Sequence, residues 1–260
     1  MIMRLGCCAT VEQLELVQEA GFDFCEMRVG TVLPDETEKT FEAVSKAIGK
    51  LRIVPEAWNN LLPWDMRLTG PEVDMERIGR YLRTALKRIA HLGGQVVVFG
   101  SGGSRNTPKG FPIIKANEQV KAFLGFIGKE AEACGLTIAI EPLNRESSNI
   151  INTIAEAVNV ANEVNHPNIK VLADLYHMHE VGESPYEVMT AGELLAHAHI
   201  ADTNRLYPGS GNYPHLEYFQ ALKAMNYQGR MSIECAFTDF PAESPKALEF
   251  LRKLDAEVNG

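Results

Sequence analysis

The sequence predicts an α/β protein with the architecture of a (β/α)8 barrel, or TIM barrel, formed by residues 1–260 as a single domain. Short apolar segments alternate with longer segments of helical periodicity, and eight such pairs follow one another. Most of the short segments are apolar on both faces, which is typical of strands in a buried parallel sheet. The length of 260 residues also fits the about 250 residues that this barrel typically needs.

The expected strands are short and rich in aliphatic residues, with three consecutive valines in the fourth. They comprise residues 5–8, 22–27, 52–56, 95–100, 136–141, 169–174, 194–201 and 231–234. The turn after the first strand, Cys7-Cys8-Ala9-Thr10, lacks the glycine-rich phosphate-binding pattern of open, doubly wound sheets. A closed barrel is therefore favoured over an open sheet.

The expected helices are marked by apolar residues at helical spacing or by a capping residue. The first begins at Thr10, where Gln13 completes a capping box, and it ends before Gly21. The others are marked by residues 41–48, 78–89, 120–134, 153–164, a short segment near 186, 216–222 and 248–254. No linker or low-complexity segment divides the chain, so one domain is expected.

Composition and charge exclude several classes of protein. The net charge of −9 argues against a nucleic-acid-binding surface, which is usually basic. No apolar run approaches the ~18 residues of a membrane span, and the first residues become polar too early for a secretory signal. The five cysteines, without zinc-type spacing, are expected to be reduced core thiols. A cytoplasmic protein with no nucleic-acid or membrane partner is expected.

Four polar residues stand at the carboxyl ends of the last four expected strands. They are Glu141, Asp174, His199 and Glu234. In a (β/α)8 barrel these strand ends form one face, where active sites lie, so the four side chains should converge. A charge at the end of an apolar strand is costly unless it is paired or bound to a metal.

Three carboxylates and one imidazole suit a single divalent cation. This oxygen-rich set favours Mn²⁺, which we take as the first choice, or Mg²⁺ or Co²⁺, and Zn²⁺ also accepts such ligands. The alternative is a charge cluster without metal, neutralised by Arg145 or Arg205.

Several motifs resemble those of the sugar isomerase and epimerase barrels related to xylose isomerase. They are EPLNR (141–145), NT (152–153), DLYHM (174–178), HAHIADTNR (197–205) and PGSG (208–211). The pattern is most similar to that of ketose 3-epimerases and hydroxypyruvate isomerases. The similarity is dense from about residue 136 to residue 237 and only architectural before that.

The resemblance implies a metal-dependent isomerase or epimerase that acts on a sugar or keto-sugar. The implied metal ligands are Glu141, Asp174, His199 and Glu234. Glu141 and Glu234 would also be the acid–base pair, while His177 and Arg205 would hold substrate oxygens. A metal that binds a carbonyl and its neighbouring hydroxyl would stabilise a cis-enediolate, and a glutamate on each face would invert the carbon. The resemblance also suggests a homodimer or homotetramer.

One position departs from the pattern of the epimerases. They carry a glutamate two residues after the arginine of the EPLNR-like run, whereas this chain has Ser147 there, next to Glu146. This puts the usual ketohexose or ketopentose substrate in doubt, while it leaves the metal site intact.

Two interpretations stand for the polar and aromatic residues of the early strands and for one histidine. Glu26, Glu56 and Trp58 could line the pocket, or the two glutamates could pair with arginines inside the barrel. His197 could orient a metal ligand, or it could be a polar core residue that is hydrogen-bonded inside the barrel.

The segment after the seventh strand also has two interpretations. Asp202 could orient Arg205 or cap a turn. Residues 208–211 follow a strand after which barrels often bind phosphate, but glycines there could simply form a tight turn.

Three other functions compete with the epimerase. A dehydratase or lyase acting on a keto-sugar or keto-inositol would use the same metal and expel a hydroxyl group. An apurinic endonuclease shares the barrel, but it needs histidines at early strand ends, where this chain has Glu26-Met27, Glu56-Ala57 and Phe99-Gly100. A non-catalytic sugar-binding barrel would bind its ligand without moving a proton.

Overall fold

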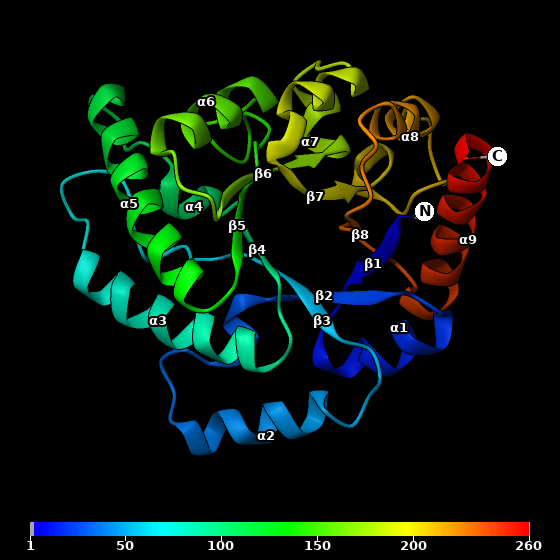
Figure 1. Ribbon diagram of the computed structural model, residues 1–260, viewed down its shortest axis with the longest axis horizontal. Coiled ribbons are helices and arrows are strands. Elements are labelled where there is room, and N and C mark those ends of the chain that lie inside the picture. Colours follow the sequence, from blue (N-terminus) through cyan, green and yellow to red (C-terminus); the bar gives the residue numbers. More distant parts are fainter. Residues whose placement is uncertain (1–2, 260) are drawn as a thin grey trace.

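The computed structural model describes residues 3–259 and forms a closed barrel of eight parallel strands (Figure 1). The strands are β1 (Arg4–Cys8), β2 (Phe24–Arg28), β3 (Pro55–Asn59), β4 (Val96–Phe99), β5 (Thr137–Ile140), β6 (Ile169–Asp174), β7 (Leu195–Ile200) and β8 (Arg230–Ile233). Each strand pairs with the next along the chain, and β8 closes the ring against β1. The expected (β/α)8 barrel is confirmed.

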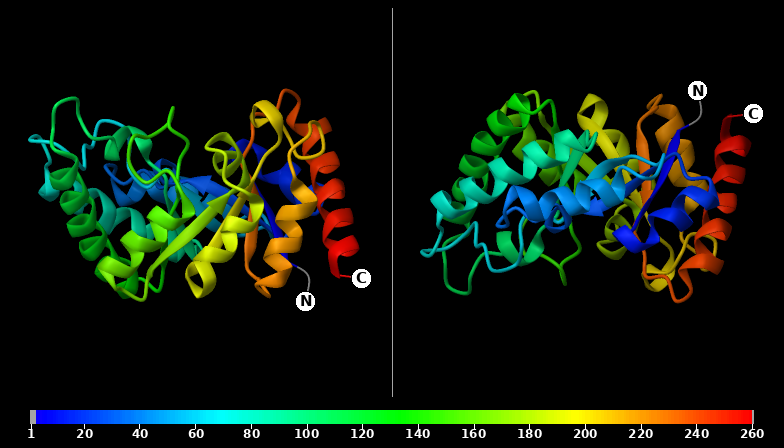
Figure 2. Two further views of the ribbon diagram at one scale, coloured as in Figure 1. Left: turned by 90° about the horizontal axis from the view of Figure 1, so that it is seen from above. Right: turned by 90° about the horizontal axis from the view of Figure 1, so that it is seen from below.

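Helices surround the strands on the outside of the barrel (Figures 1 and 2). The α-helices are α1 (Leu14–Ala20), α2 (Glu38–Ile48), α3 (Met75–His91), α4 (Gly102–Arg105), α5 (Ile113–Ala133), α6 (Ile154–Val164), α7 (Leu175–Glu180), α8 (His215–Ala224) and α9 (Phe240–Asn259). The 3-10 segments are η1 (Val11–Gln13), η2 (Val29–Val32), η3 (Pro185–Leu194) and η4 (Thr203–Arg205). Helix α9 returns to the start of the barrel, where Arg252 donates to Asp23 at 2.9 Å.

The barrel interior is a small apolar plug, separate from the larger core between strands and helices. The plug consists of Phe24, Ala57, Val96, Val98, Ala139 and Leu172. These side chains point inward because alternate residues of a strand face opposite sides. Gly6 makes room for the Phe24 ring, since a Cβ on Gly6 would lie 2.4 Å from it. The plug closes the barrel beneath the carboxyl ends of the strands.

The third strand starts three residues later than the sequence analysis expected. It runs over Pro55–Asn59, so Glu56 lies near the amino end of the barrel and not at its functional face. There Glu56 accepts hydrogen bonds from Arg4 at 2.7 Å and from Arg230 at 2.6 Å. Of its two interpretations, pairing with barrel arginines is correct.

The expectation that Trp58 could line the pocket is wrong. Its side chain is fully buried in the outer core, and its indole N–H donates to the carbonyl of Pro55 at 2.7 Å. The neighbouring residues Ala57 and Asn59 point into the barrel instead, as strand alternation requires.

None of the helices in the described part of the chain combines the length and apolar character that crossing a membrane requires. All five cysteines are free, and Cys7 and Cys25 are buried.

Candidate metal centre and substrate pocket

Four side chains from four consecutive strands meet at the carboxyl end of the barrel. Glu141 follows β5, Asp174 ends β6, His199 lies near the end of β7, and Glu234 follows β8. One ligand atom from each of the four lies within 4.8 Å of the others. The structure therefore brings together all four residues that the sequence singled out as metal ligands.

The ring of His199 faces two of these carboxylates with the same nitrogen. Its Nδ1 lies 3.3 Å from Oε1 of Glu141 and 3.4 Å from Oε2 of Glu234. Burial opposes a charge on the ring, but the nearby carboxylates of Glu26 and Glu234 outweigh it and raise the pKa of His199 well above its ordinary value. A proton on Nδ1 thus occupies the direction in which a cation would be bound.

One carboxylate oxygen of Asp174 is available to bind a ligand. Its Oδ1 accepts a hydrogen bond from the backbone N–H of Tyr176 at 2.9 Å, which begins helix α7. Its Oδ2 is buried and has no hydrogen-bond partner among the described residues. A buried carboxylate oxygen without a partner is costly, and a bound cation would remove that cost.

The charge balance of the cluster also fits a divalent ion. Burial raises the pKa values of Glu141 and Asp174, and the negative charge of Glu234 raises both further. A cation at the centre would relieve this repulsion. The four residues therefore fit one divalent metal in number, in chemistry and in arrangement.

Arg205 lies at the rim of the cluster. Its Nη2 donates to Oε2 of Glu234 at 2.5 Å, and its guanidinium lies over the Tyr176 ring, 4.9 Å from the centroid. Burial opposes ionisation of Glu234, but His199 and Arg205 outweigh it and hold the Glu234 pKa at about 2. Arg145 is exposed and donates to Asn152 at 3.4 Å, and within residues 3–259 it forms no ion pair with the cluster.

The backbone around Arg205 is held in an unusual conformation. Asn204 and Arg205 have φ values of 59° and 58°, in the left-handed region that non-glycine residues seldom adopt. The Arg205 carbonyl accepts from the backbone N–H of Ala236 at 2.7 Å, which connects this segment to the residues that follow β8. Strained backbone of this kind often occurs at functional sites.

His177 is buried beside the cluster and presents one nitrogen to it. Its Nδ1 accepts from the backbone N–H of Asn144 at 3.1 Å, so the ring proton lies on Nε2. That Nε2 is 3.7 Å from Oδ2 of Asp174. Burial lowers the pKa of His177, which favours a neutral ring that can donate to an oxygen in the site.

Asp202 organises the loop that follows β7. Its carboxylate accepts backbone hydrogen bonds from Thr203 at 2.7 Å, from Gly209 and Gly211 at 2.9 Å, and from Tyr213 at 3.2 Å. A Cβ on Gly211 would lie 2.4 Å from this carboxylate. Of its two interpretations, capping a turn is correct, and the glycines of 208–211 serve that turn.

Two residues that fix Glu141 were missed by sequence reasoning. Gly100 lacks the Cβ that would lie 2.2 Å from Oε2 of Glu141. Arg105, fully buried, donates to the carbonyls of Phe99 at 2.9 Å, Glu141 at 2.8 Å and Ile151 at 3.2 Å. Burial lowers the pKa of Arg105 to about 10, so it remains a cation at neutral pH. The sequence feature that could have pointed to Arg105 was an arginine in the short glycine-rich segment after the fourth strand.

Asn59, also missed, connects the early strands to the cluster. Its Nδ2 lies 3.4 Å from Oε1 of Glu234 and 3.4 Å from Sγ of Cys8. Its Oδ1 is buried without a hydrogen-bond partner in the described chain. The signal for Asn59 was a polar residue at an inward position of β3, which the misplaced strand concealed.

A cavity of about 600 Å³ opens beside the cluster, a size typical of small-molecule sites. The early strands and their loops supply most of its walls, among them Cys8, Thr10, Gln13, Glu26, Arg28, Thr31, Asn59 and Asn60. The segment after β8 contributes Glu234, Cys235 and Phe237, and the first residue of α9 contributes Phe240. Glu146 and Ser147 are not among the residues that line it, and Glu146 is exposed.

Comparison with known proteins finds one family model along most of the chain. Residues 14–254 match the model described as xylose isomerase-like TIM barrel. A D-psicose 3-epimerase of Enterocloster bolteae is 37% identical over 109 residues, which is 42% of this chain and 36% of that protein. A 3-dehydro-D-guloside 4-epimerase of Escherichia coli is 27% identical over 238 residues, 86% of each chain. These relatives are named epimerases, which are isomerase-class enzymes acting on sugars.

The match to the psicose epimerases is partial in sequence and nearly complete in structure. Each of the first three such relatives is matched over less than half of its length, 36%, 37% and 44%. A crystal structure of D-psicose 3-epimerase in the presence of D-fructose superimposes with a TM-score of 0.86 at 22% identity, covering 99% of this chain and 100% of that one. An apo 3-keto-D-glucoside 4-epimerase from E. coli gives 0.82 at 26% identity, covering 96% and 99%.

Proposed function

Because the chain belongs to the xylose isomerase-like TIM barrel family, we propose that it is a metal-dependent epimerase or isomerase of keto-sugars. It would move a proton at a carbon next to the carbonyl group. The observation that carries this proposal is the meeting of Glu141, Asp174, His199 and Glu234, in which one Asp174 oxygen has no hydrogen-bond partner among the described residues. Mn²⁺ is the first choice of metal for this ligand set.

The residues around the cluster have separate tasks in the proposed reaction. A divalent ion held by the four residues would polarise the carbonyl group and stabilise negative charge that develops on the neighbouring oxygens. Glu141 and Glu234 come from different strands and can exchange protons with the substrate from two sides. His177 donates from Nε2, and Arg205 donates from its guanidinium, so both can hold substrate oxygens.

The pairing of Arg205 with Glu234 supports a role for Glu234 as the proton acceptor. The Arg205 contact at 2.5 Å favours the ionised carboxylate, which is the form that a proton acceptor requires. The Tyr176 ring lies against the guanidinium, so it can hold the carboxylate and a substrate oxygen in one arrangement. Positioned acid–base groups of this kind are worth about 10²–10⁴-fold each.

A 4-epimerase of keto-glycosides is a second candidate. The E. coli 3-dehydro-D-guloside 4-epimerase matches 86% of this chain, whereas the psicose epimerases match 42% to 47%. Ser147 stands where the ketose 3-epimerase pattern has a glutamate, which also favours a substrate other than a free ketohexose. Free ketoses and 3-keto-glycosides should therefore be compared directly.

The decisive experiment is incubation of Mn²⁺-loaded protein with a panel of ketoses and 3-keto-glycosides in D2O. An epimerase incorporates one deuterium next to the carbonyl and yields an isomer that is otherwise of equal composition. A dehydratase yields a product lighter by one water, and a sugar-binding protein yields no exchange. Chelation should abolish the exchange reversibly, and Glu141→Gln or Glu234→Gln should remove most of it. Full activity in metal-free protein would refute the proposal.

A further inference from the structure

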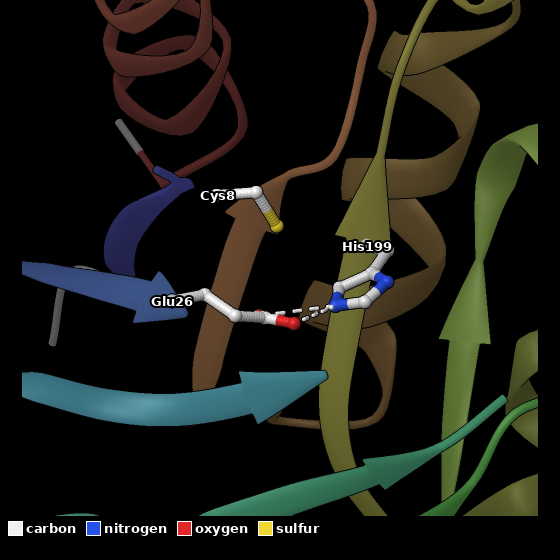
Figure 3. Close-up of side chains that lie close together, drawn as sticks. All are labelled: Cys8, Glu26 and His199. Atoms are coloured by element: carbon white, nitrogen blue, oxygen red, sulfur yellow. Dashed lines mark hydrogen bonds and ion pairs between the residues drawn. The ribbon is translucent and has the colours of Figure 1, made fainter. Parts of the chain in front are cut away.

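A carboxylate outside the four-residue cluster lies between two histidine rings inside the barrel. Glu26, on β2, points across the barrel to β7, and Figure 3 shows its carboxylate directed at the ring of His199. The Nε2 of His199 lies 3.0 Å and 3.1 Å from the two Glu26 oxygens, and the Nε2 of His197 lies 2.8 Å from Oε2. Glu26, His197 and His199 are all fully buried.

These contacts determine which nitrogen of His199 carries its proton when a metal is bound. Both oxygens of the Glu26 carboxylate lie within hydrogen-bond distance of histidine Nε2 atoms, and a carboxylate accepts hydrogen bonds. Nε2 of His199 must then be the N–H donor. Nδ1, which faces Glu141 and Glu234, is left with its lone pair free for a metal.

We propose that Glu26 is a positioning residue for the metal centre, which holds the His199 ring in the orientation and tautomer that direct Nδ1 at the ion. The inference rests on the proposed metal-dependent function. Glu26 acts through His199, because both of its oxygens are engaged by Nε2 atoms and it is not part of the four-residue cluster. Its carboxylate also increases the basicity of the ring as a ligand.

The surroundings of Glu26 keep it in place. His197 bridges it to Ser232 on β8, whose Oγ lies 3.2 Å from the same Nε2. The edge of the Phe24 ring packs against His197, with 6.3 Å between the ring centroids, and closes the barrel below. Hydrogen bonds to a charged group are stronger in such a desolvated interior. His197 is thus a hydrogen-bonded core residue that reaches the centre through its hydrogen bond to Glu26 and through the contact of its ring with His199, with 5.0 Å between the ring centroids.

A metal bound by Glu26 itself is the alternative use of this cluster. Cys8, Glu26 and His199 offer ligand atoms within 4.8 Å of one another. An ion held there would have to displace the hydrogen bonds between the Glu26 oxygens and the Nε2 of His199. It would also bind the nitrogen opposite to the one that faces Glu141 and Glu234. The geometry therefore favours a hydrogen-bond acceptor over a second metal site.

The test compares Mn²⁺ binding by the wild-type protein, Glu26→Gln, Glu26→Ala and a matched control, Glu56→Gln. Glu56 is likewise a buried barrel glutamate, but it pairs with Arg4 and Arg230 at the opposite end. We expect Glu26→Gln to weaken Mn²⁺ binding, so that the dissociation constant rises about 10–100-fold. Glu56→Gln should lower the melting temperature and leave Mn²⁺ affinity within about twofold of wild type. Thermal melts identify a variant that fails to fold, and the isosteric Gln keeps the test valid if Ala unfolds.

Two spectroscopic readouts separate positioning from a structural role. In Zn²⁺-loaded, ¹⁵N-histidine-labelled protein, His199 should show an Nε2-bound proton that exchanges slowly, and Glu26→Gln should shift or lose it. In Co²⁺-loaded protein, the visible spectrum should change on Glu26→Gln and show no sulfur charge-transfer band.

Each contrary outcome identifies a different error. If Glu26→Gln leaves the Mn²⁺ affinity unchanged, the inference is overturned while the proposed function stands. A rise in the substrate KM at constant Mn²⁺ affinity would also overturn the inference, because Glu26 would then contact the substrate. A sulfur charge-transfer band would also overturn it in favour of Cys8 ligation. Wild-type protein that binds no divalent ion would refute the proposed function itself.

Discussion

The Glu141 carboxylate occupies space that exists only because residue 100 is glycine. A Cβ on Gly100 would lie 2.2 Å from Oε2 of Glu141, closer than any two such atoms can approach. The φ angle of Gly100 is outside the left-handed region, so its backbone can accept alanine. The glycine therefore serves the position of a neighbouring side chain.

Gly100→Ala should damage the metal centre more than the fold. The new methyl group must displace the Glu141 carboxylate, and a displacement of ~1 Å at a catalytic group can cost ~10²-fold in rate. We expect weaker Mn²⁺ binding by calorimetry, with a far-ultraviolet circular dichroism spectrum like that of the wild type. Gly125→Ala, in α5 with open space around it, is the control and should be neutral or slightly stabilising. Equal Mn²⁺ affinity in Gly100→Ala and wild type would contradict this account.

Arg105→Met should lower the free energy of unfolding by about 2–5 kcal/mol. The variant leaves the carbonyls of Phe99, Glu141 and Ile151 without their buried donor, and each unsatisfied group costs about 1–3 kcal/mol unless water reaches it. Urea denaturation measures the loss. Arg83→Met removes a half-exposed ion pair with Glu130 and should cost about 0–1 kcal/mol. If the two variants lose similar amounts of unfolding free energy, the hydrogen bonds of Arg105 stabilise the fold no more than a surface ion pair does.

Asp174→Asn should remove the thermal stabilisation that Mn²⁺ confers. A ligand present at 100 times its dissociation constant adds about 2.7 kcal/mol, which corresponds to roughly 5–10 °C in the melting temperature of a protein of this size. Wild-type protein should show this shift and lose it in excess chelator. Asp255→Asn, a buried aspartate in α9, should retain the shift. A full shift in Asp174→Asn would exclude that oxygen from the metal centre.

Asp202→Asn should alter the acid limb of the stability profile. Burial acts to raise the Asp202 pKa, but backbone N–H groups of Thr203, Tyr213 and Gly211 outweigh it, and the folded pKa lies below the ordinary value of 3.8. The ionised form therefore stabilises the fold above about pH 4, and this contribution is lost as pH falls through the lower folded pKa.

The difference in the free energy of unfolding between wild type and Asp202→Asn measures the contribution of the ionised carboxylate. We expect the variant to be less stable by about 1–3 kcal/mol at pH 7, because an amide cannot accept all four backbone hydrogen bonds. The difference should shrink below pH 4, as measured by urea denaturation at pH 7, 4 and 3. A difference that does not depend on pH would contradict the assigned role of the charge.

The second half of the site was predictable because its signal is local. Glu141, Asp174 and Glu234 each end an apolar run, His199 lies in the seventh strand, and a barrel forces the ends of its strands onto one face. The chain needs no further information to place these four together. His177 and Arg205 follow two of the same strands and lie beside the cluster as expected.

The first half was less predictable because its contacts depend on register across the barrel. Pro55 starts β3, three residues later than the apolar pattern suggested, and this shift moved Glu56 to the opposite end and brought Asn59 to the site. The partners of Glu26 lie more than 170 residues away, so no local pattern shows whether it meets arginines or histidines. Arg105 and Gly100 act on Glu141 through space that only the packed structure defines.

The walls of the cavity come mainly from residues 8–60, whereas the four clustered side chains come from residues 141–234. Under the proposed function, the groups that react and the groups that select a substrate are therefore encoded in separate stretches of the chain. Substitutions at Thr10, Gln13, Arg28 or Asn60 would then reshape the space offered to a sugar without replacing any of the four clustered residues. A laboratory library confined to these positions would thus vary substrate choice while it keeps the proposed metal centre intact.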